Sequence, residues 1–349
     1  MTRDGSEYLR RCFVPTLGLQ LSARAHYGLH VAFMAACAWM TLWPSSQPAH
    51  LTVFVLLSAV IASYSLRLSN HLVLGWFMLA ATLTGDAATI LGTPASEARA
   101  LTVLSVQGLV VVTYVLSFTH KLNRDFLSLD ASYASRFAAF VCWDRGVRRP
   151  ALIRFFERYS VASTLAFEFA IPVLLVIPAT RSYGLLLGIG FHFSLALLGI
   201  VNFSAVMYAG LAAFLPPAIQ EAWPPHLPPV PAAVIVLACV VATAMVWVVT
   251  PRRANRHLPY QHRGPAWVIQ TCFGLITAWF ALEVMHLIVH PSAAAQRYGL
   301  AGTGGLAPAL AILVALYAAN GLAPYLGMKT EFSMAMFSNL RCKGWNHLL

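Results

Sequence analysis

The chain has 349 residues, of which 59% are hydrophobic and only 10% are charged. Soluble domains carry about 25% charged residues, so the composition excludes an ordinary soluble protein and indicates a polytopic membrane protein. The 23 basic residues outnumber the 12 acidic ones, but they lie between apolar runs, where they set membrane topology. The basic excess therefore does not point to nucleic acid.

Long apolar runs follow one another along the chain. Backbone groups in lipid must be hydrogen-bonded within their own segment, so each run is predicted to be a helix. In chain order the runs are 26–43, 50–66, 71–91, 100–119, 160–177, 183–217, 232–249, 265–288 and 306–326. The predicted fold class is all-α, a bundle of transmembrane helices that forms a single domain over residues 1–349.

The sixth run, 183–217, is too long for one straight crossing. Its 35 residues would form a helix of about 52 Å, against a bilayer core of about 30 Å. We divide it near Gly199 to Asn202, which gives ten helices, or nine if this run does not cross twice. Ten crossings place nearly all basic residues on the inner side. This topology predicts a bacterial inner membrane protein with both termini in the cytoplasm and an uncleaved start.

Two connecting segments are not predicted to span. Residues 120–159 mix eight basic residues with aromatic ones, a pattern typical of amphipathic helix on an anionic membrane face; a solvated inner loop is the alternative. Residues 217–231 are proline-rich and are predicted to be an extended outer connector. Residues 221–349 contribute further helices and a short polar tail.

Polar residues within the spans are costly and therefore informative. If the third and fourth runs form a hairpin that turns near residue 96, His71 and Lys121 lie at the same depth. A turn near residue 180 likewise brings Glu168 and His192 to equal depth, so we expect each pair to be in contact. The alternatives are that the histidines only join helices and that Lys121 only anchors a helix end in the headgroups.

The run 265–288 offers a competing site. Glu283, His286 and His290 are spaced at i, i+3 and i+7, on one face of a helix, and Glu-x-x-His is the spacing of carboxylate-bridged di-iron bundles. A complete site needs further ligands, and only Glu168, His192 and Asp86 are available for it. No metal is therefore expected, and a metal-dependent membrane oxidase is kept as an alternative.

Three stretches resemble vitamin K-dependent gamma-glutamyl carboxylases. "VVTYVLSFTHKLNRDFL", with Tyr114, His120 and Lys121, looks like the segment that holds their catalytic lysine. "NHLVLGWFMLAATLTGD" resembles their Asn-His segment, matching at His71 and Asp86, and "FHFSLALLGIVNFSAVMYAGLAAFLPP" resembles their Phe-His helix. The resemblance covers roughly residues 15–220, the module shared with bacterial relatives in the HTTM superfamily. The tail also looks like those of short bacterial members.

The resemblance implies a reaction and its participants. Lys121 would act as the base toward a reduced naphthoquinone of the vitamin K or menaquinone type, with oxygen and carbon dioxide as co-substrates. His71 would assist it, and Asp86, Glu168, His192, Tyr114 and His120 would be supporting polar residues. An ordinary lysine is protonated at neutral pH, and burial among apolar walls would disfavour its charged form.

The leading hypothesis is a carboxylase-like lyase or oxidoreductase that depends on quinol and oxygen. The large extramembrane portion that grips the substrate protein in the carboxylases has no counterpart in this sequence, so glutamate carboxylation is not carried over. The expected partners are the lipid bilayer, a lipophilic quinone and a small-molecule, lipid or peptide substrate. The alternative is a membrane protein that binds a quinone or lipid, or transports a solute, without catalysis.

Overall fold

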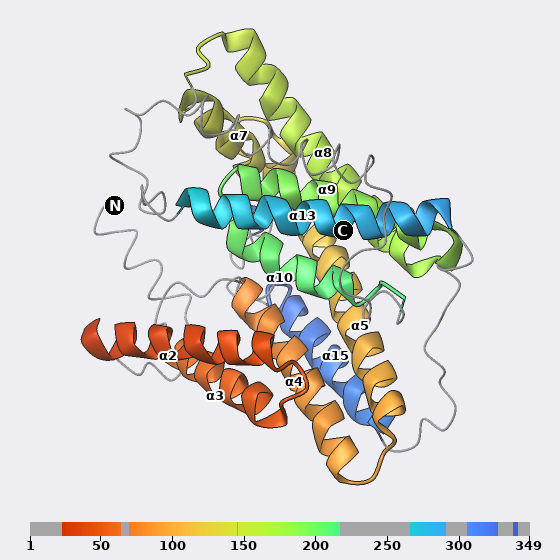
Figure 1. Ribbon diagram of the computed structural model, residues 1–349. Coiled ribbons are helices and arrows are strands. Elements are labelled where there is room, and N and C mark those ends of the chain that lie inside the picture. The colour runs from red at the N-terminus through yellow and green to blue at the C-terminus, as the bar shows by residue number, and fades with distance from the viewer. Residues whose placement is uncertain are drawn as a thin grey trace. The chain divides into compact units, whose positions relative to one another are not determined.

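The computed structural model describes residues 23–63, 70–144, 146–216, 266–290, 306–326 and 338–340, and every regular element within them is a helix (Figure 1). The helices are α2 (Ala23–Leu42), α3 (Gln47–Ser63), α4 (Asn70–Ile90), α5 (Ala95–Lys121), α6 (Arg124–Leu127), α7 (Tyr133–Asp144), α8 (Pro150–Val176), the 3-10 turn η1 (Pro178–Thr180), α9 (Arg181–Leu197), α10 (Val201–Ala212), α13 (Ala266–Val289) and α15 (Leu306–Leu322). The predicted all-α class is confirmed for these residues.

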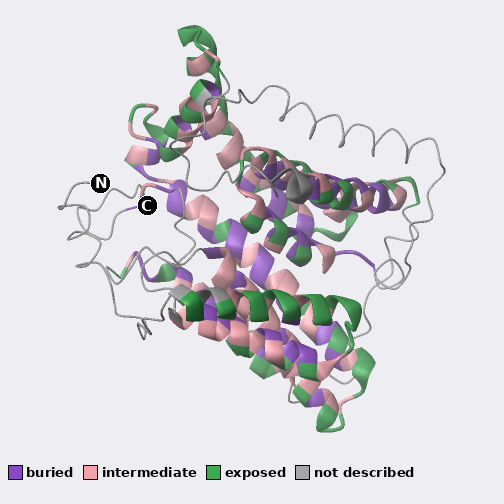
Figure 2. Ribbon diagram, turned by 60° about the vertical axis from the view of Figure 1, so that its left-hand side comes forward, coloured by how far each residue is buried: buried purple, intermediate pink, exposed green. Residues whose placement is uncertain are grey.

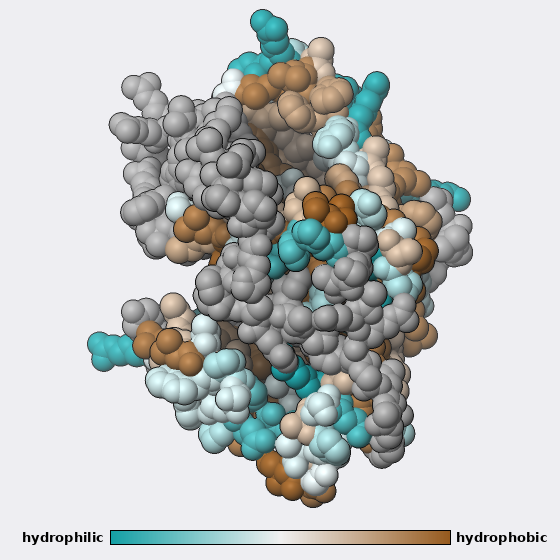
Figure 3. Space-filling model, turned by 45° about the vertical axis from the view of Figure 1, so that its right-hand side comes forward, coloured by the Kyte–Doolittle hydropathy of each residue, from teal (hydrophilic) through white to brown (hydrophobic). Residues whose placement is uncertain are grey.

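Among the described residues, four helices are long and apolar enough to cross a membrane: α4, α5, α8 and the Thr271–Val289 part of α13. The predicted runs coincide with described helices except for 232–249, which lies outside the described residues together with the connector 217–231. Apolar side chains are also exposed on the protein surface, as the brown patches of Figure 3 show. The chain is helical where it is described, and the length and composition of these four helices are compatible with a membrane protein.

The predicted break in the sixth run is present, but the two pieces are short. Gly199 adopts a left-handed φ of 100°, and the N–H groups of Gly199 and Ile200 donate to the carbonyls of Ala196 and Leu195. This pair of bonds is a Schellman motif, which ends a helix and favours glycine. At 17 and 12 residues, α9 and α10 measure about 26 and 18 Å, less than the bilayer core. Their lengths do not support two full crossings here.

The described chain divides into two compact units, with the boundary inside α5 between Leu116 and Ser117. In the first unit, α3 packs on α2 and α4, and α15 packs on α4. Ala81, Leu101 and Leu310 form a buried apolar cluster there. These helices are apolar on most faces, so packing against neighbours, rather than an amphipathic pattern, selects the buried side.

In the second unit, α8 packs on α7 and α9, and α9 also packs on α10 and α13. The segment 120–159 forms α6, α7 and the start of α8. Its aromatic side chains divide into two groups: Phe126 is fully buried, whereas Trp143 and Phe155 are 61% and 58% exposed. The start of α8 is mostly exposed (Figure 2), so the aromatic residues of this segment do not form one common apolar core.

The turn between α8 and α9 depends on a glycine. A Cβ atom added at Gly184 would lie 2.9 Å from the Leu174 Cβ and 2.9 Å from the Leu175 backbone nitrogen. Contacts this short force the two helices apart. The close approach of α8 to α9 therefore requires glycine at this position, and α8 carries Glu168, a residue of the site described below.

We expect Gly184→Ala to lower the free energy of unfolding by about 1–3 kcal/mol, the usual cost of overpacking. Gly190, in the same helix, has no atom within 4 Å of its added Cβ. Gly190→Ala is the matched control and should be neutral or stabilising by up to about 1 kcal/mol, because alanine is the better helix former. Unfolding titrations in detergent would measure both, and equal effects would contradict the prediction.

Candidate functional site

Lys121 and Glu168 form a buried ion pair between the end of α5 and the middle of α8. The Lys121 Nζ lies 2.9 Å from the Glu168 Oε1. Ser117, one turn before Lys121, closes a three-membered ring: Nζ donates to the Ser117 Oγ at 2.7 Å, and this hydroxyl donates to Oε1 at 2.8 Å. Two donors, the Lys121 ammonium and the Ser117 hydroxyl, thus share one acceptor oxygen of Glu168.

Local sequence explains how these groups meet. Ser117 and Lys121 are four residues apart and lie on the same face of α5. After α5, Asn123 accepts from the Phe126 N–H and caps α6. This places the Phe126 ring beneath the ammonium, with 5.9 Å between Nζ and the ring centroid, within the range of a cation–π contact.

Burial gives the pair its chemical character. Lys121 is 3% exposed and Glu168 is 6% exposed, so protein covers the ammonium and it does not reach headgroups. The interpretation of Lys121 as a headgroup anchor is therefore wrong for this structure. The second carboxylate oxygen, Glu168 Oε2, is buried without a hydrogen-bond partner within the described residues. A buried acceptor of this kind costs free energy until a donor reaches it.

Helix α8 is also irregular at this position. Pro172 lies inside α8 and has no N–H to donate to the carbonyl of Glu168, four residues earlier. The backbone beside the carboxylate consequently lacks one bond of the helix ladder. The sequence "AFEFAIP" therefore places the charged residue at a weakened point of the helix.

The predicted partners of Glu168 and His192 differ from those in the structure. Across the described chain, the hydrogen bonds of the Glu168 carboxylate go to Ser117 and Lys121, and none goes to His192. His192 is fully buried between the rings of Phe191 and Phe203, at centroid distances of 5.2 and 5.5 Å. The predicted Glu168–His192 pair is wrong: equal depth does not fix which way a side chain points around its helix.

The other predicted site residues of this region lie on α4 and α5. His120 is fully buried next to Lys121, and Tyr114 is 2% exposed on α5. His71 lies in α4, in the first unit, whereas Lys121 belongs to the second. The predicted approach of His71 to Lys121 stays a prediction.

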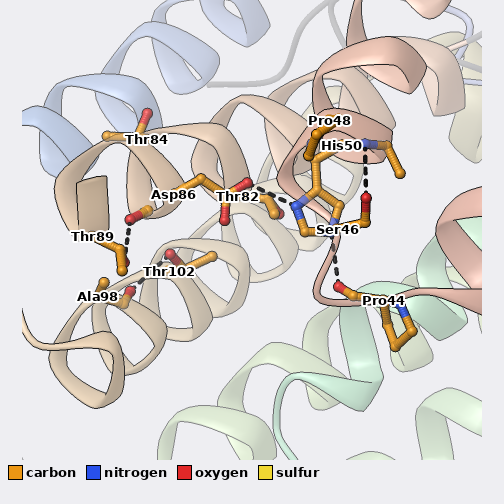
Figure 4. A network of polar contacts seen from close by, with 12 residues as sticks. Pro44, Ser46, Pro48, His50, Thr82, Thr84, Asp86, Thr89, Ala98 and Thr102 are labelled. Atoms are coloured by element: carbon orange, nitrogen blue, oxygen red, sulfur yellow. Dashed lines mark hydrogen bonds and ion pairs between the residues drawn. The ribbon is translucent and has the colours of Figure 1, made fainter.

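Asp86 has a partner that the sequence reasoning missed. The His50 Nδ1 lies 2.7 Å from the Asp86 Oδ2, and the His50 Nε2 donates to the Pro44 carbonyl at 2.9 Å (Figure 4). Because a carbonyl can only accept, the contact with Pro44 needs a hydrogen on Nε2. With both imidazole nitrogens engaged, His50 ties the α2–α3 turn to α4, which is a structural role.

The alternative metal site on α13 does not assemble in the described residues. Glu283 is buried and the rings of His286 and His290 lie 4.6 Å apart. No group of three or more His, Cys, Asp or Glu side chains suited to a metal ion forms within the described ranges. Glu283, His286 and His290 share a helix face, as the spacing predicts. No further metal ligand from another described helix joins them in a metal-binding group.

Two residues of the Lys121 site were not found from the sequence. Ser117 is one turn before Lys121, and a Ser-x-x-x-Lys spacing at the end of an apolar helix was the available signal. Asn123 lies two residues after Lys121 in "HKLNRDFL", and an asparagine with an acidic residue in the turn that follows it is typical of a helix N-cap. Both signals are short and occur widely in unrelated proteins.

Comparison of the chain with protein-family models, with curated proteins and with solved structures gave no match.

Proposed function

We propose that the chain is an integral membrane enzyme that depends on a quinol and oxygen and uses Lys121 as a base. The observation that carries the proposal is the buried Lys121–Glu168 pair with its unpartnered oxygen, Glu168 Oε2. Buried, paired titratable groups are found at many functional sites. The resemblance to vitamin K-dependent carboxylases supplies the candidate chemistry.

The residues present fit a reduced naphthoquinone. When bound, this group would supply a phenolic hydroxyl and the electrons for reaction with oxygen. Glu168 Oε2 would accept a hydrogen bond from that hydroxyl, since it is an acceptor with no other donor among the described residues. The Lys121 Nζ lies 2.9 Å from Oε1, the other oxygen of the same carboxylate.

The pair also provides a way to form a neutral amine. Transfer of a proton from the Lys121 Nζ to the Glu168 Oε1 along their 2.9 Å bond converts the ion pair into an amine and a carboxylic acid. The exchange moves no net charge out of the site, and separated charges are costly in surroundings without water. With a reduced quinone bound, the Lys121 amine would be the acceptor for a hydroxyl proton, and the ammonium would stabilise negative charge beside it.

The finer membrane topology belongs to the same proposal. The charge distribution favours about ten crossings, whereas the short helices α9 and α10 favour nine. With ten crossings, both termini and the Lys121 end of α5 would lie on the cytoplasmic side of a bacterial inner membrane. The segment α6–α7, with its arginines and exposed aromatic residues, would then lie at the inner membrane surface.

The test is a turnover assay on purified protein in nanodiscs. Chemically reduced menaquinone, oxygen and labelled carbon dioxide are supplied together with a membrane lipid extract. The expected result is oxygen uptake that depends on both quinol and protein, with label fixed if carboxylation is the coupled reaction. Saturable quinone binding without any turnover would favour the alternative of a binding or transport protein, and would overturn the enzyme proposal.

A further inference from the structure

The C-terminal segment Ser338–Asn339 is hydrogen-bonded to the linker that follows Lys121, which joins α6 to the start of α7 (residues 128–133). The Asn339 Oδ1 accepts from the Tyr133 N–H at 2.8 Å, and the Asn339 Nδ2 donates to the Ala131 carbonyl at 3.0 Å. One side chain thus pairs with a backbone donor and a backbone acceptor, more than 200 residues earlier in the chain.

A second asparagine continues the connection to the site. The fully buried Asn123 Nδ2 donates both to the Ser338 carbonyl and to the carbonyl of His120, in the last turn of α5. Its Oδ1 accepts from the Phe126 N–H. Asn123 therefore joins the C-terminal segment to the helix end that carries Lys121 and to the ring beneath the ammonium.

We propose that Ser338–Asn339 form a clamp that positions Lys121. The clamp fixes the linker at Ala131 and Tyr133 through Asn339, and fixes the end of α5 through Ser338 and Asn123. Without the clamp, Asn123 loses its buried hydrogen bond to the Ser338 carbonyl, two residues after Lys121. The effect on turnover rests on the proposed function, whereas the effect on the position of the Lys121 amine does not.

The clamp is specific for asparagine at position 339. The residue has a φ of 60°, a left-handed conformation that asparagine tolerates better than most side chains. Glycine tolerates it too but has no side chain to bond. Aspartate can accept from Tyr133 but cannot donate to the Ala131 carbonyl at neutral pH. Asn339→Gly thus removes both bonds of the clamp to the linker without backbone strain, and Asn339→Asp removes the bond to the Ala131 carbonyl.

The experiment measures how readily the Lys121 amine is acetylated. Folded protein in nanodiscs is treated briefly with an amine-reactive acetylating reagent, and labelling of Lys121 is quantified by mass spectrometry relative to the same peptide in denatured protein. Asn339→Gly and Asn339→Asp should raise the labelling rate about tenfold, which corresponds to the loss of one or two net hydrogen bonds. Tryptic cleavage at Arg124, which is exposed on α6, should rise in parallel.

Asp130→Asn is the matched control. Asp130 lies in the same linker, its side chain is 87% exposed, and its carboxylate bonds to Arg154 rather than to the C-terminal segment. This variant should label and cleave as the unmodified protein does. Thermal unfolding of all variants identifies the folded fraction, to which the labelling is normalised.

The possible results separate the two proposals. If Lys121 labelling rises in both Asn339 variants while the unmodified protein shows no quinol turnover, the clamp stands and the proposed function fails. If the unmodified protein turns over, the Asn339 variants should show a lower kcat and a displaced pH profile at an unchanged KM for quinol. Lys121 labelling that is unchanged in both variants would overturn the clamp, even if cleavage at Arg124 rises.

Discussion

Lys121→Arg is expected to fold normally and to lose turnover by about 10²-fold or more, the usual scale for a lost general base. The guanidinium group keeps a positive charge and can still pair with the Glu168 carboxylate, but it stays protonated at any physiological pH. A quinol-dependent oxygen uptake assay at matched amounts of folded protein measures the loss. Retention of the fold is checked by thermal unfolding.

Lys121→Ala provides the complementary measurement. It removes both charge and base and leaves Glu168 without its ion-pair partner, so it discriminates less well by itself. A small exogenous amine should partly restore turnover in this variant if it can occupy the space vacated by the lysine. Full activity in Lys121→Arg would reduce Lys121 to a structural cation that holds α5 against α8.

Helix positions were predictable because they depend on local composition. The apolar runs match α4, α5 and α13 closely, since a helix in lipid must satisfy its own backbone groups. The end of α9 at Gly199 was also predictable, because a glycine within a long apolar run provides the left-handed residue that a helix end needs. The short length of α10 was not, because the apolar composition continues past its end at Ala212.

Side-chain partners were harder to predict than helices. The depth argument placed Glu168 correctly as a buried residue that needs a partner, but it chose His192 instead of Lys121. Helix α8 is apolar around most of its circumference near Glu168, so periodicity does not show which face meets α5 and which meets α9. The contact of Asn339 with the linker was beyond reach for another reason: it joins segments more than 200 residues apart.

The two charges of the buried pair should be strongly coupled in stability. Glu168→Gln leaves the Lys121 ammonium without a counter-ion, and Lys121→Met likewise leaves the Glu168 carboxylate without one. Each single change should lower the free energy of unfolding by about 3–5 kcal/mol, since it strands a buried charge. The double variant removes both charges, so its loss of stability should be smaller than the sum of the two single losses, with a coupling of about 0.5–3 kcal/mol. Unfolding titrations in mixed micelles measure all four proteins.

An exposed ion pair in the same unit supplies the control for this cycle. Arg154 bonds to Asp130 and Glu157 at distances of 3.3 and 3.2 Å, but its side chain is half exposed. Water screens such a pair, so Asp130→Asn, alone or combined with Arg154→Met, should change stability little and should show no measurable coupling. If the Lys121–Glu168 cycle behaves in the same way, solvent reaches the ammonium and the carboxylate. The proton transfer between them would then lack the dry surroundings that favour the neutral pair, and the case for Lys121 as a base would fail on stability data alone, before any turnover is measured.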